Sequence, residues 1–290
     1  MHARVAAATT AALLGGTVLI LPTTSAHAAD DDGPVVVAHR GASAYAPENT
    51  LAAVDKADDL GFSWVENDVQ RTKDGVLVVV HDATLTRTTD VEKVYPDRAP
   101  WRVADFTAKE ISRLDAGSWF GRRYAGTRVP TLKQYMNRIS LNHQKLVLEI
   151  KNPELYPGIE GQTLKVLSNE GWLDPGHLRS RLIVQSFSPD SVRTVHDLRP
   201  GVKTALLGTP SVANLPAYSR FADQINSSHS TISTGYVAAV HAFDGPHGKP
   251  LEILTWTVDD ARTARRVAGY GVDGVITNRP DVVRRALSGY

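Results

Sequence analysis

Charged and imidazole side chains stand at the ends of several apolar runs in this 290-residue chain. His39 and Arg40 end one run and could supply a proton-transfer group beside a fixed cation. His81 ends another run, and the adjacent Asp82 could orient its imidazole or cap the following turn. A histidine after a strand is more often structural than catalytic, so each of these signals is weak when taken alone.

Two carboxylates, Glu66 and Asp68, lie two positions apart at the end of an apolar run. Side chains alternate between the two faces of a strand, so both carboxylates should point the same way. Neighbouring carboxylates repel each other unless a cation lies between them. Oxygen ligands of this kind suit a hard divalent ion such as Mg²⁺ or Ca²⁺. Pairing with an arginine, or capping of a turn, is the alternative.

Glu149 and Lys151 repeat this spacing at the end of a third apolar run. Charged groups in such a strand are costly unless they are paired or bound to a ligand. Glu149 could complete a metal site of three carboxylates, and the Lys151 ammonium could reach a phosphate. A buried ion pair between the two residues explains the pattern equally well.

Later strand ends offer polar and aromatic groups that could line a pocket. Gln185 with Phe187, and Trp256 further on, would suit the carbon part of a small polar ligand. Aromatic side chains in such positions more often belong to the hydrophobic core, and packing is the competing interpretation for these residues.

Strand and helix patterns alternate along the chain and predict an α/β fold with a parallel sheet. Short apolar runs, most of them rich in β-branched residues, are expected to be buried strands: Val35–Ala38, Ser63–Val69, Val76–Val80, Leu146–Ile150, Leu182–Val184, Lys203–Leu207, Ala222–Ile225, Leu251–Thr255 and Gly274–Ile276. Amphipathic or capped stretches are expected to be helices: Thr50–Leu60, Ile159–Ser168, Ser188–Leu198, Asp259–Ala268 and Arg279–Leu287. A closed (β/α)₈ TIM barrel fits the length and number of elements, with an open doubly wound sheet as the rival.

One long polar stretch, at about residues 83–130, breaks this alternation after the second strand region. Trp101 and Trp119 lie within it and favour an ordered segment. Long loops in compact domains are usually functional or disordered. We expect a small insertion that follows an extra strand and packs over one end of the barrel.

The order of the polar groups is more informative than any one of them. Each follows a predicted strand, and the carboxyl ends of barrel strands open on one mouth. Two histidines, three carboxylates and two cations at one mouth indicate metal-assisted attack at phosphorus. One histidine would accept a proton from the nucleophile, and the other would donate a proton to the leaving alkoxide.

The first 28 residues have the pattern of a secretory signal peptide. Arg4 precedes an apolar run from Val5 to Leu21, and a small-residue stretch ends in an A-x-A pattern at Ala28. The run is short beside the roughly 20 apolar residues of a membrane-spanning helix. We therefore expect export, cleavage near Ala28 and a barrel domain over residues 29–290, rather than a stable membrane anchor.

Composition excludes several classes of partner and site. The chain carries 32 basic and 31 acidic side chains, which argues against recognition of nucleic acid or an anionic membrane by bulk charge. It has no cysteine, so disulfides, thiolate metal sites and a cysteine nucleophile are excluded. The expected partner is a small molecule, and composition does not indicate the oligomeric state.

Motifs along nearly the whole expected mature chain resemble those of the glycerophosphodiester phosphodiesterase family, in its secreted bacterial form. They are His39-Arg40-Gly41 with Pro47-Glu48-Asn49-Thr50, Glu66-Asn67-Asp68-Val69, Thr72-Lys73-Asp74-Gly75, Val80-His81-Asp82, Leu148-Glu149-Ile150-Lys151, Trp256-Thr257-Val258 and Asp273-Gly274-Val275-Ile276-Thr277-Asn278-Arg279-Pro280-Asp281. Each piece is short and common, whereas the joint pattern is specific.

The resemblance implies a TIM barrel that hydrolyses glycerophosphodiesters to sn-glycerol 3-phosphate and an alcohol. It implies acid–base catalysis by His39 and His81, and phosphate binding by Arg40 and Lys151. It also implies one divalent ion, Ca²⁺ or Mg²⁺, on the three carboxylates. Asn278 stands where the family often has aspartate, and we expect this difference to lie outside the chemistry.

Two alternatives remain open at this point. Phospholipase D-like enzymes, which act on intact phospholipids or lysophospholipids, resemble the family in fold and histidine pair, although such toxins usually carry disulfides in their loops. A binding protein on the same scaffold that has lost catalysis is the second, because fold does not fix function. The complete set of catalytic-type residues argues against it. The leaving alcohol, and whether water or a substrate hydroxyl attacks first, are not indicated.

Overall fold

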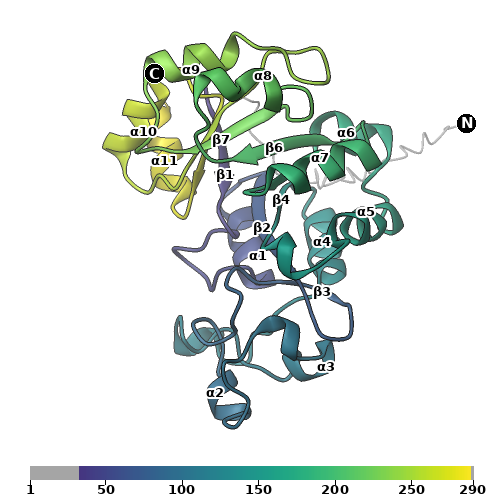
Figure 1. Ribbon diagram of the computed structural model, residues 1–290. Coiled ribbons are helices and arrows are strands. Elements are labelled where there is room, and N and C mark those ends of the chain that lie inside the picture. The colour runs from purple at the N-terminus through teal and green to yellow at the C-terminus, as the bar shows by residue number, and fades with distance from the viewer. Residues whose placement is uncertain (1–32, 289–290) are drawn as a thin grey trace, which may run out of the picture.

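The computed structural model describes residues 33–288, and within them eight parallel strands form a closed barrel (Figure 1). The predicted signal peptide lies outside these described residues. The barrel closes because β1 pairs with both β2 and β9. The strands are β1 (Val35–Ala38), β2 (Trp64–Arg71), β4 (Lys145–Ile150), β5 (Leu182–Ser186), β6 (Lys203–Leu207), β7 (Gln224–Ser228), β8 (Leu254–Trp256) and β9 (Gly274–Thr277). The predicted TIM barrel is confirmed, and the open sheet is excluded.

Helices surround the barrel and follow its strands. They are α1 (Leu51–Asp59), α4 (Leu132–Leu141), α5 (Ile159–Asn169), α6 (Pro175–Ser180), α7 (Pro189–Leu198), α8 (Leu215–Tyr218), α9 (Thr234–His241), α10 (Ala261–Ala268) and α11 (Pro280–Leu287). The predicted cap of α7 is present, because the Ser188 hydroxyl accepts a hydrogen bond from the Ser191 amide. The sequence analysis did not predict α4, α6, α8 or α9.

Apolar side chains form layers outside and inside the barrel. Outside, one cluster joins the first strands to α1, α4 and α5, and a second joins the later strands to α9, α10 and α11. Inside, a smaller cluster consists of Val37, Val147, Ile183, Ala205, Leu254 and Ile276. Some of its members line the cavities at the two ends of the barrel. This interior cluster therefore lies between the two ends of the barrel.

The insertion has a hydrophobic core of its own. The short strand β3 (Leu77–Val79) runs antiparallel to β2 and leads into it. The insertion then contains α2 (Val91–Val94), α3 (Ala108–Ile111) and the 3₁₀ turns Val103–Asp105 and Arg122–Tyr124. Its core includes Leu85, Phe106 and Leu114. Figure 1 shows this segment as a lobe at the foot of the view, away from most of the barrel helices.

Two strands lie further along the chain than the hydrophobic pattern predicted. The apolar run Ala222–Ile225 predicted β7, but β7 covers Gln224–Ser228. The run Leu251–Thr255 predicted β8, which begins only at Leu254. In β7 the inward side chains are polar, and the Asn226 side-chain amide donates to Gln185 Oε1 at 2.9 Å. A search for apolar runs therefore misses a strand whose inward side chains are amides.

Candidate active site

Three carboxylates meet at the mouth because of the register between β2 and β4. Asp68 lies directly opposite Glu149 across this parallel pair, and Glu66 precedes Asp68 by two positions on the same face. Glu66, Asp68 and Glu149 are almost fully buried. One oxygen of each lies within 4.8 Å of the others. The structure thus brings together the three residues that the sequence analysis selected as metal ligands.

Burial and mutual repulsion set the charge state of this group. Burial and, after it, the neighbouring Asp68 raise the pKa of Glu149 to about 8 against the opposing effect of Lys151. Burial and Asp68 also raise the pKa of Glu66. Burial acts in the same sense on Asp68, but Arg40, His81 and Lys151 outweigh it and lower the Asp68 pKa. The protein alone does not neutralise three carboxylates here.

Buried carboxylate oxygens at the mouth fit a divalent cation. Within the part of the chain that the structure describes, Asp68 Oδ1 is buried and accepts no hydrogen bond, and the Lys151 ammonium lies 3.9 Å from it. The same ammonium lies 2.8 Å from the buried Glu149 Oε1, so one cation is shared between two carboxylates. Buried acceptors left in this way are costly unless a cation approaches them. Oxygen-only donors suit Ca²⁺ or Mg²⁺, so the residues present fit a metal of this class.

A tight turn after β1 places Arg40 against the carboxylates. Arg40 and Gly41 both have positive φ angles, 55° and 78°, and a Cβ on Gly41 would meet the Ala53 backbone at 2.6 Å. The turn lets the Arg40 amide donate to Glu66 Oε2 at 3.0 Å. The Arg40 guanidinium Nε lies 3.2 Å from Asp68 Oδ2. Arg40, which was predicted to be a fixed cation, therefore contacts Glu66 and Asp68 at the edge of the mouth.

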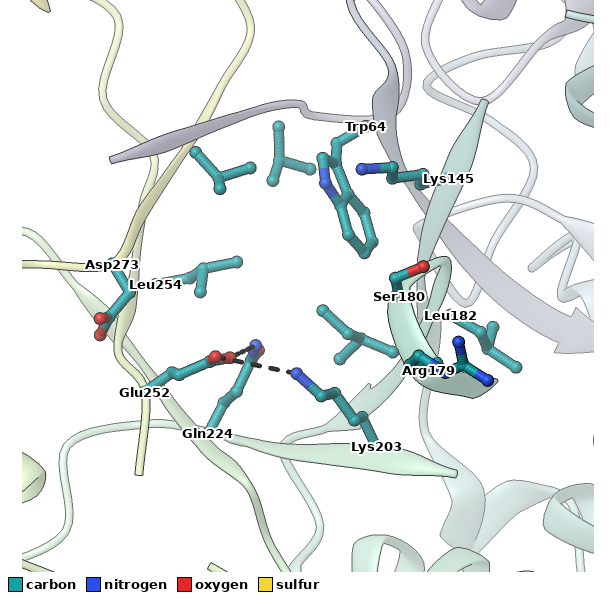
Figure 2. A pocket seen from close by; sticks show the side chains of 13 residues that line it. Trp64, Lys145, Arg179, Ser180, Leu182, Lys203, Gln224, Glu252, Leu254 and Asp273 are labelled. Carbon is teal, nitrogen blue, oxygen red and sulfur yellow. Dashed lines mark hydrogen bonds and ion pairs between the residues drawn. The ribbon is translucent and has the colours of Figure 1, made fainter. Parts of the chain in front are cut away.

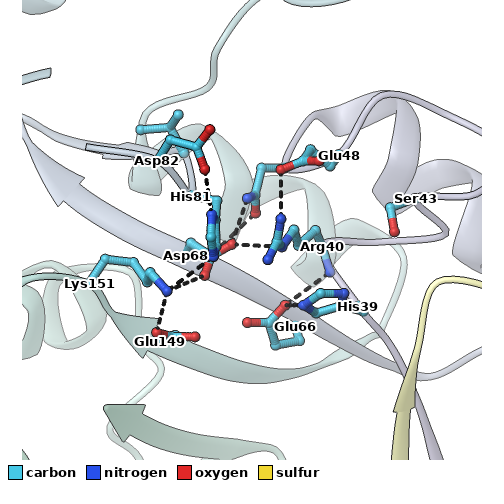
Figure 3. Close-up of polar contacts among 12 residues, drawn as sticks. His39, Arg40, Ser43, Glu48, Glu66, Asp68, His81, Asp82, Glu149 and Lys151 are labelled. Carbon is cyan, nitrogen blue, oxygen red and sulfur yellow. Dashed lines mark hydrogen bonds and ion pairs between the residues drawn. The ribbon is translucent and has the colours of Figure 1, made fainter. Parts of the chain in front are cut away.

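His39 is held by a residue that we expected to lie outside the chemistry. Its Nδ1 lies 2.7 Å from Asn278 Oδ1, so that expectation for Asn278 is wrong. The Asn278 amide nitrogen donates to Asp259 Oδ2 at 2.7 Å, which leaves its carbonyl oxygen for His39. His39 Nδ1 must then carry the hydrogen. Its Nε2 is free to accept a proton and lies 3.9 Å from Glu66 Oε2 (Figure 3).

The charge of His39 follows from its surroundings. Burial lowers its pKa to about 4, and the adjacent Arg40 guanidinium acts in the same direction. Asp68, Glu48 and the hydrogen bond with Asn278 oppose this lowering without cancelling it. His39 is therefore a neutral imidazole at neutral pH, which is the form that can act as a base.

His81 reaches the mouth by a different route from the other groups. It follows β3, the extra strand that the sequence predicted before the insertion, and β3 runs antiparallel to β2. The Val80 amide donates to the Asp68 carbonyl, so β3 carries the chain back to the level of Asp68. His81 Nδ1 lies 2.6 Å from Asp82 Oδ1, and Nε2 lies 3.2 Å from the Lys151 ammonium (Figure 3).

A cavity of about 110 Å³ lies among these side chains. His39, His81, Glu149 and Lys151 line it, together with the candidate pocket residues Gln185, Phe187 and Trp256. Phe187 is 51% exposed and meets Trp256 edge to face, with ring centroids 5.7 Å apart. Packing in the hydrophobic core, the competing interpretation, is thus wrong for Phe187. Gln185 is buried in the barrel and accepts the hydrogen bond from Asn226.

The sequence analysis assigned no role to four polar residues that support the site. Asn49 donates to Asp68 Oδ2 at 2.8 Å, and Glu48 accepts from Arg40 at 2.9 Å. Arg87 binds Glu48, and Asp259 binds Asn278. Glu48 and Asn49 lie within the motif that follows His39, so their position was a usable signal. Arg87 and Asp259 had no comparable signal, because they lie in none of these motifs and bind Glu48 and Asn278, which are distant in the sequence.

A larger cavity, of about 240 Å³, opens at the other end of the barrel (Figure 2). Lys145, Lys203 and Gln224, each the first residue of its strand, line it together with Trp64 and the apolar interior. Its charged groups have partners or are exposed, as when Lys203 lies 3.7 Å from Glu252. Its size exceeds that of the mouth cavity, but the carboxylate cluster and both candidate histidines lie at the mouth.

The described residues contain no helix that is long and apolar enough to cross a membrane.

Comparison with known proteins identifies relatives of the chain. The model of the glycerophosphoryl diester phosphodiesterase family matches residues 39–282. A glycerophosphodiester phosphodiesterase of Caldanaerobacter subterraneus subsp. tengcongensis is 36% identical, over 86% of this chain and 96% of the relative. One of Bacillus subtilis (strain 168) is 33% identical, over 88% of this chain and 87% of the relative.

A solved structure is similar over the same region. A phosphodiesterase of Oleispira antarctica in complex with the product sn-glycerol-3-phosphate matches with a TM-score of 0.75 at 29% identity. The match covers 88% of this chain and 96% of that one. Together with the family match, which includes every residue of the mouth described above, these similarities confirm the predicted family. The chain belongs to the glycerophosphoryl diester phosphodiesterase family and is a phosphoric diester hydrolase.

Proposed function

We propose that the enzyme hydrolyses a glycerophosphodiester to sn-glycerol 3-phosphate and an alcohol at the barrel mouth. The observation that carries the proposal is the convergence of Glu66, Asp68 and Glu149 beside two histidines and two cations. The Oleispira antarctica relative, which is in complex with sn-glycerol-3-phosphate as its product, supports the choice of product.

His39 is the better candidate for the general base. It is neutral at neutral pH because burial and Arg40 lower its pKa to about 4. Asn278 holds the hydrogen on Nδ1, so the lone pair of Nε2 faces the carboxylates. In this role Nε2 removes the proton from the attacking oxygen, whether water or a substrate hydroxyl.

His81 is the better candidate for the general acid. A carboxylate, Asp82, lies against its Nδ1, whereas a neutral amide lies against Nδ1 of His39. A carboxylate in this position stabilises positive charge on an imidazole. In this role Nε2 of His81 donates a proton to the departing alkoxide, on the side of the phosphorus opposite His39. This role requires that Lys151, whose ammonium donates to Nε2 at 3.2 Å in this structure, turns from His81 to the phosphate.

Arg40 and Lys151 would bind the non-bridging phosphoryl oxygens. Burial works against both charges, but the neighbouring carboxylates more than compensate, so each pKa is raised and both remain cations. A divalent ion held by Glu66, Asp68 and Glu149 would add Lewis-acid neutralisation of the phosphoryl charge. Fixed cations of this kind stabilise the charge that develops in the transition state.

We also propose that the enzyme is exported and loses residues 1–28. The support is the sequence of that segment, with its single basic residue, apolar run and A-x-A end at Ala28. N-terminal sequencing of protein recovered from culture medium tests this proposal. A mature chain that begins at Met1 would contradict it.

The function is tested with a panel of glycerophosphodiesters, in buffer with and without a chelator. Phosphorus NMR should show sn-glycerol 3-phosphate, and a coupled assay should show release of choline or ethanolamine, both lost with the chelator. Release of phosphocholine would mean that the other ester bond is cut. If only lysophosphatidylcholine turns over, the phospholipase D-like alternative replaces the proposal.

A further inference from the structure

Arg87 lies in the insertion, outside the mouth cavity, yet it binds carboxylates from two separate segments of the chain. Its Nη1 and Nη2 donate to both oxygens of Glu48, at 2.8 and 2.7 Å. Its Nε donates to Asp82 Oδ2 at 2.6 Å, and Nη2 also reaches Asp82 Oδ1 at 3.1 Å. Four of the five guanidinium hydrogens are thus used on two carboxylates. We call Asp82, Arg87 and Glu48 the Arg87 bridge.

Each carboxylate of the Arg87 bridge also contacts a residue of the mouth. Asp82 accepts from His81 Nδ1 at 2.6 Å, and Glu48 accepts from Arg40 Nη1 at 2.9 Å. Arg40 in turn lies 3.2 Å from Asp68. Figure 3 shows the contacts at both ends of this chain of alternating charges. In order, its members are His81, Asp82, Arg87, Glu48, Arg40 and Asp68.

The bridge differs from an ordinary surface ion pair. Exposed pairs contribute about 0–1 kcal/mol to stability because water competes for both partners. Here Arg87 is 44% exposed, but the Glu48 side chain is only 12% exposed and the contact between them is bidentate. The hydrogen bonds from Arg87 and Arg40 lower the Glu48 pKa despite its burial. The hydrogen bonds from Arg87 and His81 likewise overcome burial and lower the Asp82 pKa to about 2.

We propose that Arg87 is a positioning residue that holds His81 and Arg40 in fixed relation across the mouth. His81 and Arg40 come from different segments, one after β3 and one after β1. The Arg87 bridge is the path by which the insertion fixes both the proton donor and the phosphate-binding cation. The insertion thereby contributes to the reaction without placing a side chain on the substrate. This inference rests on the proposed function.

The test compares two substrates with Arg87→Met, which removes the guanidinium and keeps an unbranched side chain. We expect kcat for glycerophosphocholine to fall by roughly 10–100-fold, as when a partner of a site residue is lost, with a smaller change in KM. The loss should be several-fold smaller for the p-nitrophenyl ester of glycerol phosphate, because p-nitrophenolate needs no proton from His81. A purely structural role would lower both rates alike.

Arg98→Met is the matched control. Arg98 is an arginine of the same insertion, but it pairs with Glu110 and packs on the Phe106 ring 4.0 Å away, with no contact to the mouth. We expect it to lower Tm without changing the ratio of the two rates. If Arg87→Met unfolds the protein, Arg87→Lys keeps the charge and loses the two-pronged contact, and it should show the same substrate preference with a smaller loss.

A double-mutant cycle with Asp82→Asn tests the His81 side of the bridge. If Arg87 acts through Asp82, the double variant should lose little more kcat on glycerophosphocholine than Asp82→Asn alone. Additive losses, or Arg87→Met kinetics within twofold of wild type on both esters, would overturn the inference. In both cases wild type and Arg98→Met still cleave the diester. An inactive wild type would instead contradict the proposed function.

Discussion

The two ends of the barrel both hold cavities lined by charged side chains, but they differ in how those charges are compensated. At the amino end, Lys203 pairs with Glu252, and Asp273 pairs with His241. At the mouth, Glu66, Asp68 and Glu149 are almost fully buried and outnumber the two nearby cations. The amino-end cavity, of about 240 Å³, is larger than the mouth cavity of about 110 Å³, but a second hollow of about 340 Å³ shares Glu149, Lys151 and Phe187 with the mouth.

This difference shows that uncompensated charge marks the functional end. Buried carboxylates without full compensation are costly, so a fold keeps them where a ligand makes up the difference. Charged groups that are exposed or paired around an apolar hole incur no such cost. In barrels of this type, the amino end commonly contributes to stability and the carboxyl end carries catalysis.

Among the substitutions that test this comparison of the two ends, Asp68→Ala is expected to have the largest effect on activity. Asp68 belongs to the carboxylate cluster with Glu66 and Glu149 and contacts Arg40, so its loss should abolish metal-dependent turnover. Circular dichroism and Tm should show a folded protein, because relief of repulsion between the buried carboxylates offsets the lost contacts. Full activity in chelator-treated, metal-restored buffer would remove Asp68 from the site.

The next largest effect is expected from removing either histidine at the mouth, and it tests which of them is the base and which the acid. His39→Ala and His81→Ala should each lower kcat on glycerophosphocholine by about 10²–10⁴-fold, the usual contribution of an acid or base, with less change in KM. With a p-nitrophenyl leaving group, His81→Ala should recover much of its rate and His39→Ala should not. The reverse pattern would exchange the two assignments, and near-normal rates in both would refute them.

A pH-dependent effect should appear at the mouth and not at the amino end. In the metal-free protein, burial and Asp68 raise the Glu149 pKa to about 8, far above its value of about 4.3 in an unfolded chain. The unfolded state therefore ionises first, and the folded metal-free protein loses stability as pH rises between these values. Added Mg²⁺ or Ca²⁺ should then raise Tm more at pH 8 than at pH 5.

Thermal melts across this pH range, with and without the metal, measure the effect. Asp68→Ala is the control, since its metal-induced increase in Tm should be small at every pH. A metal-induced increase of equal size at pH 5 and pH 8 in the wild type would contradict the ionisation assigned to Glu149.

The smallest effect is expected at the amino end. Lys203→Met breaks the pair with Glu252, whose atoms lie 3.7 Å apart and are partly exposed. Such pairs contribute about 0–1 kcal/mol, so Tm should change little and kcat should stay within twofold of wild type. A tenfold loss of kcat would mean that the two ends are coupled, and the comparison would fail.

The fold and the carboxylates were predictable because local patterns encode them. The three carboxylates interrupt apolar runs, and the spacing of Glu66 and Asp68 puts both on one face of β2. The register between β2 and β4 then places Glu149 beside Asp68. Helix α4 carried an unused signal, since Thr131, directly before its first residue, and Gln134, its third residue, form a capping box. Strand β7 had no such signal, because its inward side chains are amides that satisfy one another inside the barrel.

The supporting contacts were not predictable, because they depend on how distant segments meet. Nothing near Asn278 in the sequence indicates that its carbonyl oxygen holds His39. The position of His81 likewise depends on β3 turning back along β2, which an apolar run alone does not reveal. Patterns of two to four residues report which face a side chain takes, whereas its partners are decided by the tertiary structure.

The pairing of the first strand with the last has a consequence for when the enzyme becomes active. His39 and the Asn278 side chain that orients it are separated by 239 positions, and β1 hydrogen-bonds to β9 along its whole length. Chains emerge from the ribosome amino end first, and contacts of such long range form only after the intervening segments exist. A nascent chain therefore carries the carboxylates of β2 and β4 long before His39, the proposed base, is oriented. If His39 has this role, turnover begins only after the final strand closes the ring, and activity then reports that synthesis and folding of the barrel are complete.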